Sequence, residues 1–141
     1  MFDSYLRLAA NTFFSNLIFP IDQEYVEIVM LSAVIPYNKF AIYGIIFIFK
    51  FLALFFNMLI GLAAYNSFKK FINSKGLNNI IISRYFFDKY CFWFVPLFAF
   101  ISPLLLIVFS SFCGFLRLFK FRVLSAIAIE IIIDCIVVIF L

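Results

Sequence analysis

An almost wholly apolar stretch, residues 91–118, constrains this chain most strongly because a proline, Pro103, sits near its centre. A proline removes a backbone donor and clashes with the preceding turn, which costs about 3 kcal/mol in a helix interior. In a lipid bilayer the carbonyl that loses its partner has no water to bind. A single straight helix is therefore disfavoured. We expect two half-length helices that meet at Ser102 and Pro103, forming a re-entrant hairpin that enters the membrane and returns.

The composition supports a membrane location. Hydrophobic residues make up 67% of the chain and charged residues 13%, whereas soluble globular proteins have about 25% charged residues. So little polar surface cannot cover a globule in water, so we expect an all-α integral membrane protein with a single domain over residues 1–141. The sequence has no histidine, which excludes histidine catalysis, haem ligation by histidine and the usual zinc sites. No metal and no cofactor are expected.

A second proline-tipped hairpin is expected near the N-terminus, around Pro20. The apolar runs on either side, residues 6–19 and 25–35, are too short to cross a hydrocarbon core of about 30 Å at about 1.5 Å per residue. A buried helix pair of the soluble type, or an interfacial helix, is the alternative. Three acids occupy the turn and the return arm: Asp22, Glu24 and Glu27. They would lie deep in the membrane at a re-entrant tip, or at the surface if the loop is solvated.

Two proline-free apolar segments, residues 40–65 and 123–141, are expected to be full membrane spans. They are separated by a basic loop over residues 66–90, with a break near residues 74–76 and a short amphipathic piece over residues 80–87. Most of the cations lie in this loop or just after the second hairpin. Because cytoplasmic loops carry an excess of Lys and Arg, we expect this loop on the cytoplasmic side of the membrane. The expected location is a bacterial inner (cell) membrane.

The chain thus divides into a first half, about 1–65, the basic loop, and a second half, about 91–141. Each half consists of a re-entrant helical hairpin plus a transmembrane helix, and the halves enter from opposite sides. This inverted repeat is the layout of many transporters, whose broken helices meet near the midplane. Membrane lipid is the expected partner. No nucleic acid is expected, because the cations flank apolar segments, and a homo-oligomer remains an open alternative.

Ionisable residues inside the spans are candidates for transport or coupling, because they are costly there and usually face a protein interior. Lys50 lies about 15 Å into the first span, and Glu130 about 11–14 Å into the second by helical rise. Asp134 follows Glu130 on the same face. We expect Lys50 to pair with Glu130 or Asp134. The pair would either fix helix register or form a protonatable centre, unless Asp134 snorkels to the outer surface.

Polar groups near the second hairpin have simpler interpretations. Ser102, Ser110 and Ser111 could satisfy backbone groups freed by Pro103, and no nucleophile is expected among them. Arg117 and the cations after it would anchor the chain at the cytoplasmic surface, or bind a phosphate. Because no Ser or Cys nucleophile is accompanied by a base, no catalytic residues are expected and the chain is not expected to be an enzyme.

Four short motifs together resemble the DedA/VTT (SNARE-associated Golgi protein) superfamily, in particular its short YqaA-like branch. The segment FPIDQEYV at residues 19–26 is similar to the opening motif of that family, and Lys-Tyr-Cys at residues 89–91 to the motif before its second hairpin. Asn57 and Gly61 resemble a pattern late in the first long helix. Pro103, followed by Gly114 and Arg117, resembles the Pro…Gly-x-x-Arg element. The likeness extends over about residues 13–140.

The resemblance implies a function in moving lipids across bilayers, by scrambling phospholipids or flipping polyprenyl-phosphate carriers, in some members with proton coupling. It makes Glu24 the best single site residue. The chain departs from the family at Leu106 and Ile107, where an Arg and, in the YqaA-like branch, an Asp are expected, and at Phe49-Lys50, which replaces a Gly-Asn pair. The alternative is therefore a non-transporting structural or accessory subunit that keeps the fold but has lost the polar site.

Overall fold

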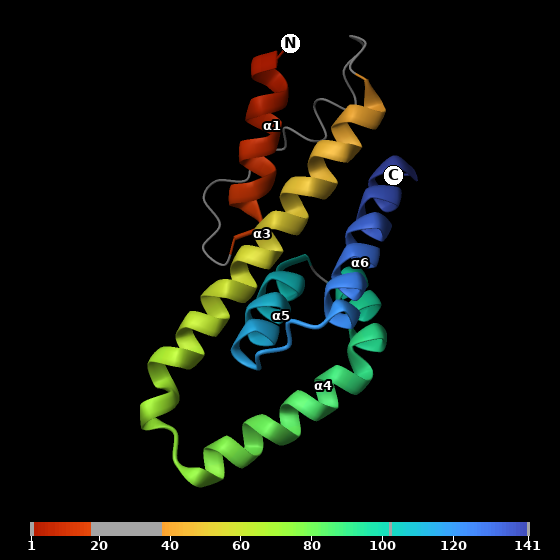
Figure 1. Ribbon diagram of the computed structural model, residues 1–141. Coiled ribbons are helices and arrows are strands. Elements are labelled where there is room, and N and C mark those ends of the chain that lie inside the picture. The colour runs from red at the N-terminus through yellow and green to blue at the C-terminus, as the bar shows by residue number, and fades with distance from the viewer. Residues whose placement is uncertain (1, 18–37, 102, 141) are drawn as a thin grey trace.

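A computed structural model describes residues 2–17, 38–101 and 103–140, and the described part of the chain is helical, without strands (Figure 1). It consists of helices α1 (Phe2–Ser15), α3 (Lys39–Phe68), α4 (Ser74–Ile101), α5 (Pro103–Phe115) and α6 (Phe121–Phe140), and a 3-10 turn η1 (Lys69–Phe71). The all-α prediction is confirmed for these residues. The predicted hairpin around Pro20, with Asp22, Glu24 and Glu27, lies outside them.

Helix α3 occupies the predicted first span. Asn38 caps its start, since the Asn38 Oδ1 accepts a hydrogen bond from the Phe40 N–H at 3.1 Å. With η1 it forms a continuous unit, Lys39–Phe71, which among the described residues is the one helix long and apolar enough to cross a membrane. Helix α6 forms where the second span is predicted, and its membrane crossing remains a prediction.

The prediction of a loop over residues 66–90 is wrong, because most of these residues are helical. Helix α3 continues to Phe68, and α4 begins at Ser74 and runs without interruption through the predicted amphipathic piece. Lys and Arg are good helix formers, and no proline lies between residues 66 and 90, so positive charge alone does not stop a helix. The helical structure is interrupted at residues 72–73. Asn73 caps the start of α4, because its Oδ1 accepts a hydrogen bond from the Gly76 N–H at 2.9 Å.

The predicted helix break at Pro103 is confirmed, because α4 ends at Ile101 and α5 begins at Pro103. Proline is well suited to the first position of a helix, where its missing N–H has no partner to lose. The two helices form a hairpin in which the Phe87 ring lies 6.1 Å from that of Phe109 and 5.2 Å from that of Phe112. The first arm is longer than predicted, because it starts at Ser74 rather than Cys91.

The helices pack as two parallel pairs joined by α5 (Figure 1). Helix α1 runs parallel to α3, with Leu8 against Ile42 and Ile46. The last part of α4 runs parallel to α6, while α3 and α6 run in opposite directions. One core cluster draws on α3, α4, α5 and α6. Its buried members are Leu54, Met58, Cys91, Leu106, Ile107, Phe109, Cys113, Leu116, Leu118, Val123, Ala126, Ile127 and Ile131.

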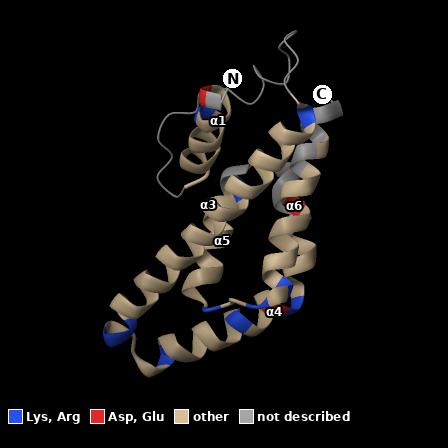
Figure 2. Cartoon of the chain, turned by 45° about the horizontal axis from the view of Figure 1, so that its top comes forward, with Lys and Arg blue, Asp and Glu red and all other residues tan. Residues whose placement is uncertain are grey.

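Positive charge gathers at one end of the molecule. Figure 2 shows Lys and Arg where α3 ends, along α4, and at the connection from α5 to α6. At this connection the Lys120 ammonium forms an ion pair with the Asp88 carboxylate of α4. This contact ties the start of α6 to the middle of α4.

Candidate functional site

The contact between α3 and α5 depends on two glycines. A Cβ atom added to Gly61 would lie 1.9 Å from the Ser111 carbonyl oxygen, and one added to Gly114 would lie 1.9 Å from the Met58 carbonyl oxygen. Each glycine therefore admits the backbone of the other helix, as small residues do where membrane helices pack closely. Asn57 and Gly61, which are four residues apart and therefore share a face of α3, are both buried.

Asn57 joins a third helix to this contact. Its side chain is 0% exposed, and its Nδ2 donates a hydrogen bond to the Asn16 carbonyl oxygen at 2.8 Å, just beyond the end of α1. The motif residues thus lie along the contacts of α3 with its two neighbours: Asn57 where α3 meets the end of α1, and Gly61 and Gly114 where α3 meets α5. Their arrangement explains their residue types by packing and hydrogen bonding.

Arg117 terminates α5 in a left-handed conformation, with φ of 58°. The Leu118 N–H donates to the Cys113 carbonyl and the Arg117 N–H to the Gly114 carbonyl, both at 2.9 Å. This is the Schellman pattern, in which a glycine usually occupies the position of Arg117. The Arg117 guanidinium carbon lies 5.8 Å from the centroid of the Tyr65 ring on α3. The residue therefore shapes a helix end and covers an aromatic ring.

The serines of α5 bond within their own helix. The hydroxyls of Ser110 and Ser111 both donate to the Ile107 carbonyl, at 2.8 and 3.1 Å. That carbonyl lies after Pro103, so these two bonds do not satisfy a backbone group freed by the proline, and the prediction is wrong for Ser110 and Ser111. Ser102 lies outside the described residues.

The positions where the resembled family carries Arg and Asp are packed in the core. Leu106 is 0% exposed and Ile107 7% exposed, and both belong to the core cluster. An ionised group at either position would be surrounded by apolar side chains, at a large desolvation cost. These two positions therefore contribute packing rather than a polar site.

Glu130 is the buried acid of α6. Its side chain is 0% exposed, and its neighbours Ile127 and Ile131 belong to the core cluster. Lys50 is half-buried on α3. By helical spacing it shares a face with Phe47 and Leu54, which pack against and in the same cluster. The predicted pairing of Lys50 with Glu130 remains a prediction. Asp134 lies one turn further along α6, and its side chain is outside the described part.

Sequence reasoning missed the ion pair between Asp88 and Lys120. The available signal was that Asp88 is the one acid between residues 66 and 122, so a cation nearby in space was to be expected. It also missed the stacking of the Arg122 guanidinium, whose carbon lies 5.8 Å from the centroid of the Phe92 ring. Within the described ranges, no group of three or more Cys, Asp or Glu side chains is placed to hold a metal ion.

Comparison of the chain with models of protein families, with curated proteins and with solved structures finds no significant match. The likeness to the DedA/VTT superfamily thus rests on the types and spacing of the motif residues.

Proposed function

We propose that the chain is a small DedA/VTT-like integral membrane protein that moves a phospholipid or a polyprenyl phosphate across the bilayer. The observation that carries this proposal is the complete burial of Glu130 in an apolar helix. An ionisable side chain inside a span costs about 2.5–3.5 kcal/mol on insertion scales and commonly marks an ion or substrate pathway. Glu130 would accept a proton from one side of the membrane and release it to the other.

The helix directions support an inverted repeat. The first and last described helices of each half are parallel, as α1 is to α3 and the last part of α4 is to α6, while the halves run in opposite directions. In transporters built this way, the substrate site lies between the halves near the bilayer midplane. The contact between α3 and α6, with Lys50 and Glu130, would be that place. The end of the molecule where Lys and Arg gather would lie on the cytoplasmic side of a bacterial cell membrane.

In this scheme Lys50 and Glu130 act together. An ionised Glu130 would hold the Lys50 ammonium, since opposite charges attract strongly in a low-dielectric interior. Protonation of the carboxylate would release the ammonium to contact a lipid phosphate. The proton gradient and the passage of the headgroup would thus be coupled through one carboxyl group.

A structural or accessory subunit without transport is the second candidate, and the burial of Leu106 and Ile107 favours it. Where the resembled family places charged groups, this chain has well-packed aliphatic side chains. Such a protein would keep the helical scaffold and use its surface to bind another membrane protein.

A reconstitution assay separates the two candidates. The purified protein is placed in liposomes that contain a headgroup-labelled lipid in both leaflets, and a membrane-impermeant reductant then destroys the exposed label. We expect the protein to make the inner-leaflet label accessible, and the E130Q variant to lose this activity while inserting normally. The matched control is D3N, which neutralises an exposed acid at the start of α1.

The outcomes are distinct. Wild-type activity in E130Q would contradict the role of Glu130. No lipid movement by the wild-type protein, with phosphatidylglycerol, phosphatidylcholine and a polyprenyl phosphate each tested, would favour the accessory subunit.

A further inference from the structure

Residues 75–93 of α4 present an unusual mixture of side chains to their surroundings. Five exposed residues recur along one side of the helix: Lys75, Ile82, Tyr85, Lys89 and Trp93. Their spacing places them within one narrow stripe of an α-helix. We call this stripe the basic-aromatic face. The opposite side of α4 packs inward, so the face is directed away from the protein core.

Neither water nor hydrocarbon suits this face. Ile82 is 66% exposed, Tyr85 71% and Trp93 79%, and an exposed row of such large apolar side chains is disfavoured in water. Two ammonium groups in the same row are equally disfavoured in hydrocarbon. Tyr, Trp and Lys together are typical of the headgroup layer, where an apolar body and a polar tip are both satisfied.

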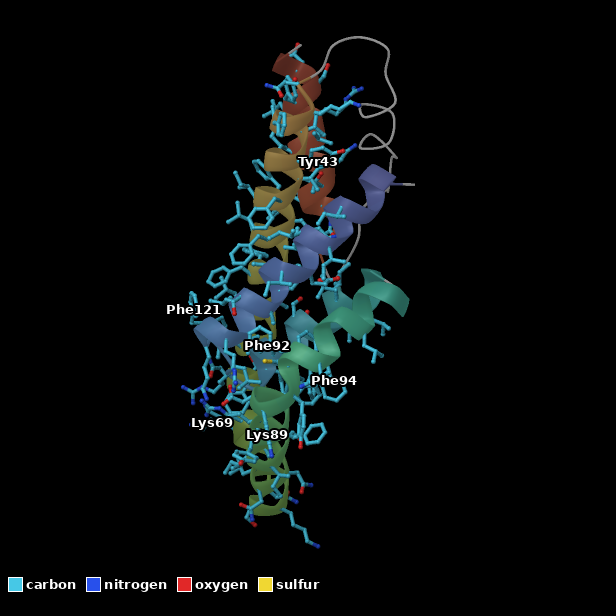
Figure 3. All side chains as sticks on the ribbon, turned by 90° about the vertical axis from the view of Figure 1, so that its right-hand side faces the viewer. Tyr43, Lys69, Lys89, Phe92, Phe94 and Phe121 are labelled. Atoms are coloured by element: carbon cyan, nitrogen blue, oxygen red, sulfur yellow. The ribbon has the colours of Figure 1, made fainter. Side chains whose placement is uncertain are left out.

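The charges around the face select the lipid. Between residues 66 and 122 the chain has eight cations and a single acid, and that acid, Asp88, is already paired with Lys120. Figure 2 shows these cations gathered at one end of the molecule, and Figure 3 shows Lys69 and Lys89 at that same end although they belong to different elements. A surface with this excess of positive charge complements negatively charged phosphates.

We propose that the basic-aromatic face lies in the headgroup layer of one leaflet and binds anionic phospholipid there. Residues 75–93 of α4 then act as an interfacial helix. Figure 1 shows the first part of α4 extending across the end of the molecule, before its last part runs beside α6. The interfacial helix concentrates anionic lipid around the protein. This inference rests on the proposed membrane location, but it does not depend on lipid transport.

Trp93 is the one tryptophan of the chain, so its fluorescence reports on this face alone. The full-length protein is reconstituted in vesicles of phosphatidylglycerol and phosphatidylcholine in equal amounts, with bromine atoms on the acyl chains of one lipid or the other. Bromine quenches tryptophan fluorescence on contact. At low salt, brominated phosphatidylglycerol should quench Trp93 at least about twofold more than brominated phosphatidylcholine, and high salt should reduce the difference. Bromines near the headgroup should quench more than bromines at the chain ends.

Variants locate the effect. K75Q/K89Q removes both cations of the basic-aromatic face and should equalise quenching by the two lipids. R7Q/K39Q is the matched control, since it removes the same charge from exposed cations of α1 and α3, and it should keep the preference. Circular dichroism verifies that both variants remain helical.

Three results would overturn the proposal. Equal quenching by both lipids in the wild-type protein would exclude selection of anionic lipid. An equal loss of preference in R7Q/K39Q would assign it to net charge rather than to this face. Absence of quenching by either lipid would place Trp93 outside the bilayer. A failure of lipid movement in the liposome assay, with the quenching preference intact, would instead count against the proposed transport alone.

Discussion

Replacing Gly114 by alanine tests the close contact between α3 and α5. The added Cβ would lie 1.9 Å from the Met58 carbonyl oxygen, 2.6 Å from its carbonyl carbon and 2.7 Å from its Cα. All three atoms are backbone of α3, so no side-chain rotation can relieve the overlap. Ordinary contact requires α5 to move away from α3 by about 1.5 Å. A gap of about 1 Å already forfeits up to about half of the dispersion energy of each atom pair.

The expected loss of stability follows from two opposing terms. Forcing extra atoms into a packed core costs about 1–3 kcal/mol, or more where backbone must shift. Alanine is favoured over glycine in a helix by about 1 kcal/mol, which offsets part of this cost. We expect G114A, and likewise G61A, to lose about 2 kcal/mol, close to a 30-fold change in the unfolding equilibrium. The double variant should lose less than the sum, because the first methyl group already separates the helices.

Gly44 provides the matched control, since it lies in the same helix α3 as Gly61 and an added Cβ would meet nothing within 4 Å. G44A should therefore be as stable as the wild-type protein or up to about 1 kcal/mol more stable. The free energy of unfolding is measured in mixed micelles by titration with a denaturing detergent, followed by circular dichroism. If G61A and G114A are as stable as G44A, then α3 and α5 do not approach as described.

Two further substitutions test single interactions by the same measurement. R117V should be about 1–2 kcal/mol less stable than R117G. Both variants lose the contact with Tyr65, but only valine is strained in the left-handed conformation. Equal stability of the two variants would exclude that conformation. N57A should lose about 1–3 kcal/mol, because it leaves the Asn16 carbonyl without this donor, whereas N66A, at an exposed position of the same helix, should change stability by less than about 0.5 kcal/mol.

The start of α5 at Pro103 could be predicted, because proline is favoured at the first position of a helix, where its missing N–H has no partner to lose. A proline alone does not set a boundary, since Pro96 lies within α4, which continues to Ile101. The long apolar segment of α3 could be predicted from composition. The helices that occupy most of residues 66–90 were not predicted from the sequence. The density of charge in this segment suggested a loop, although its residues are compatible with a helix. The decisive residue was Asn73, whose side chain caps α4, and capping is visible in a sequence only when the helix start is already known.

The motif residues show why resemblance predicts architecture better than chemistry. Gly114 is explained by a close backbone contact and Arg117 by the end of a helix, so this part of the motif would persist in a protein that only needs the scaffold. Leu106 and Ile107 remove charge from the same hairpin and fill the core instead. A transport activity would therefore have to depend on polar residues elsewhere. Among the described residues, Glu130 is the buried carboxyl that could serve, and for that reason E130Q discriminates between the two functions more sharply than any change to the motif itself.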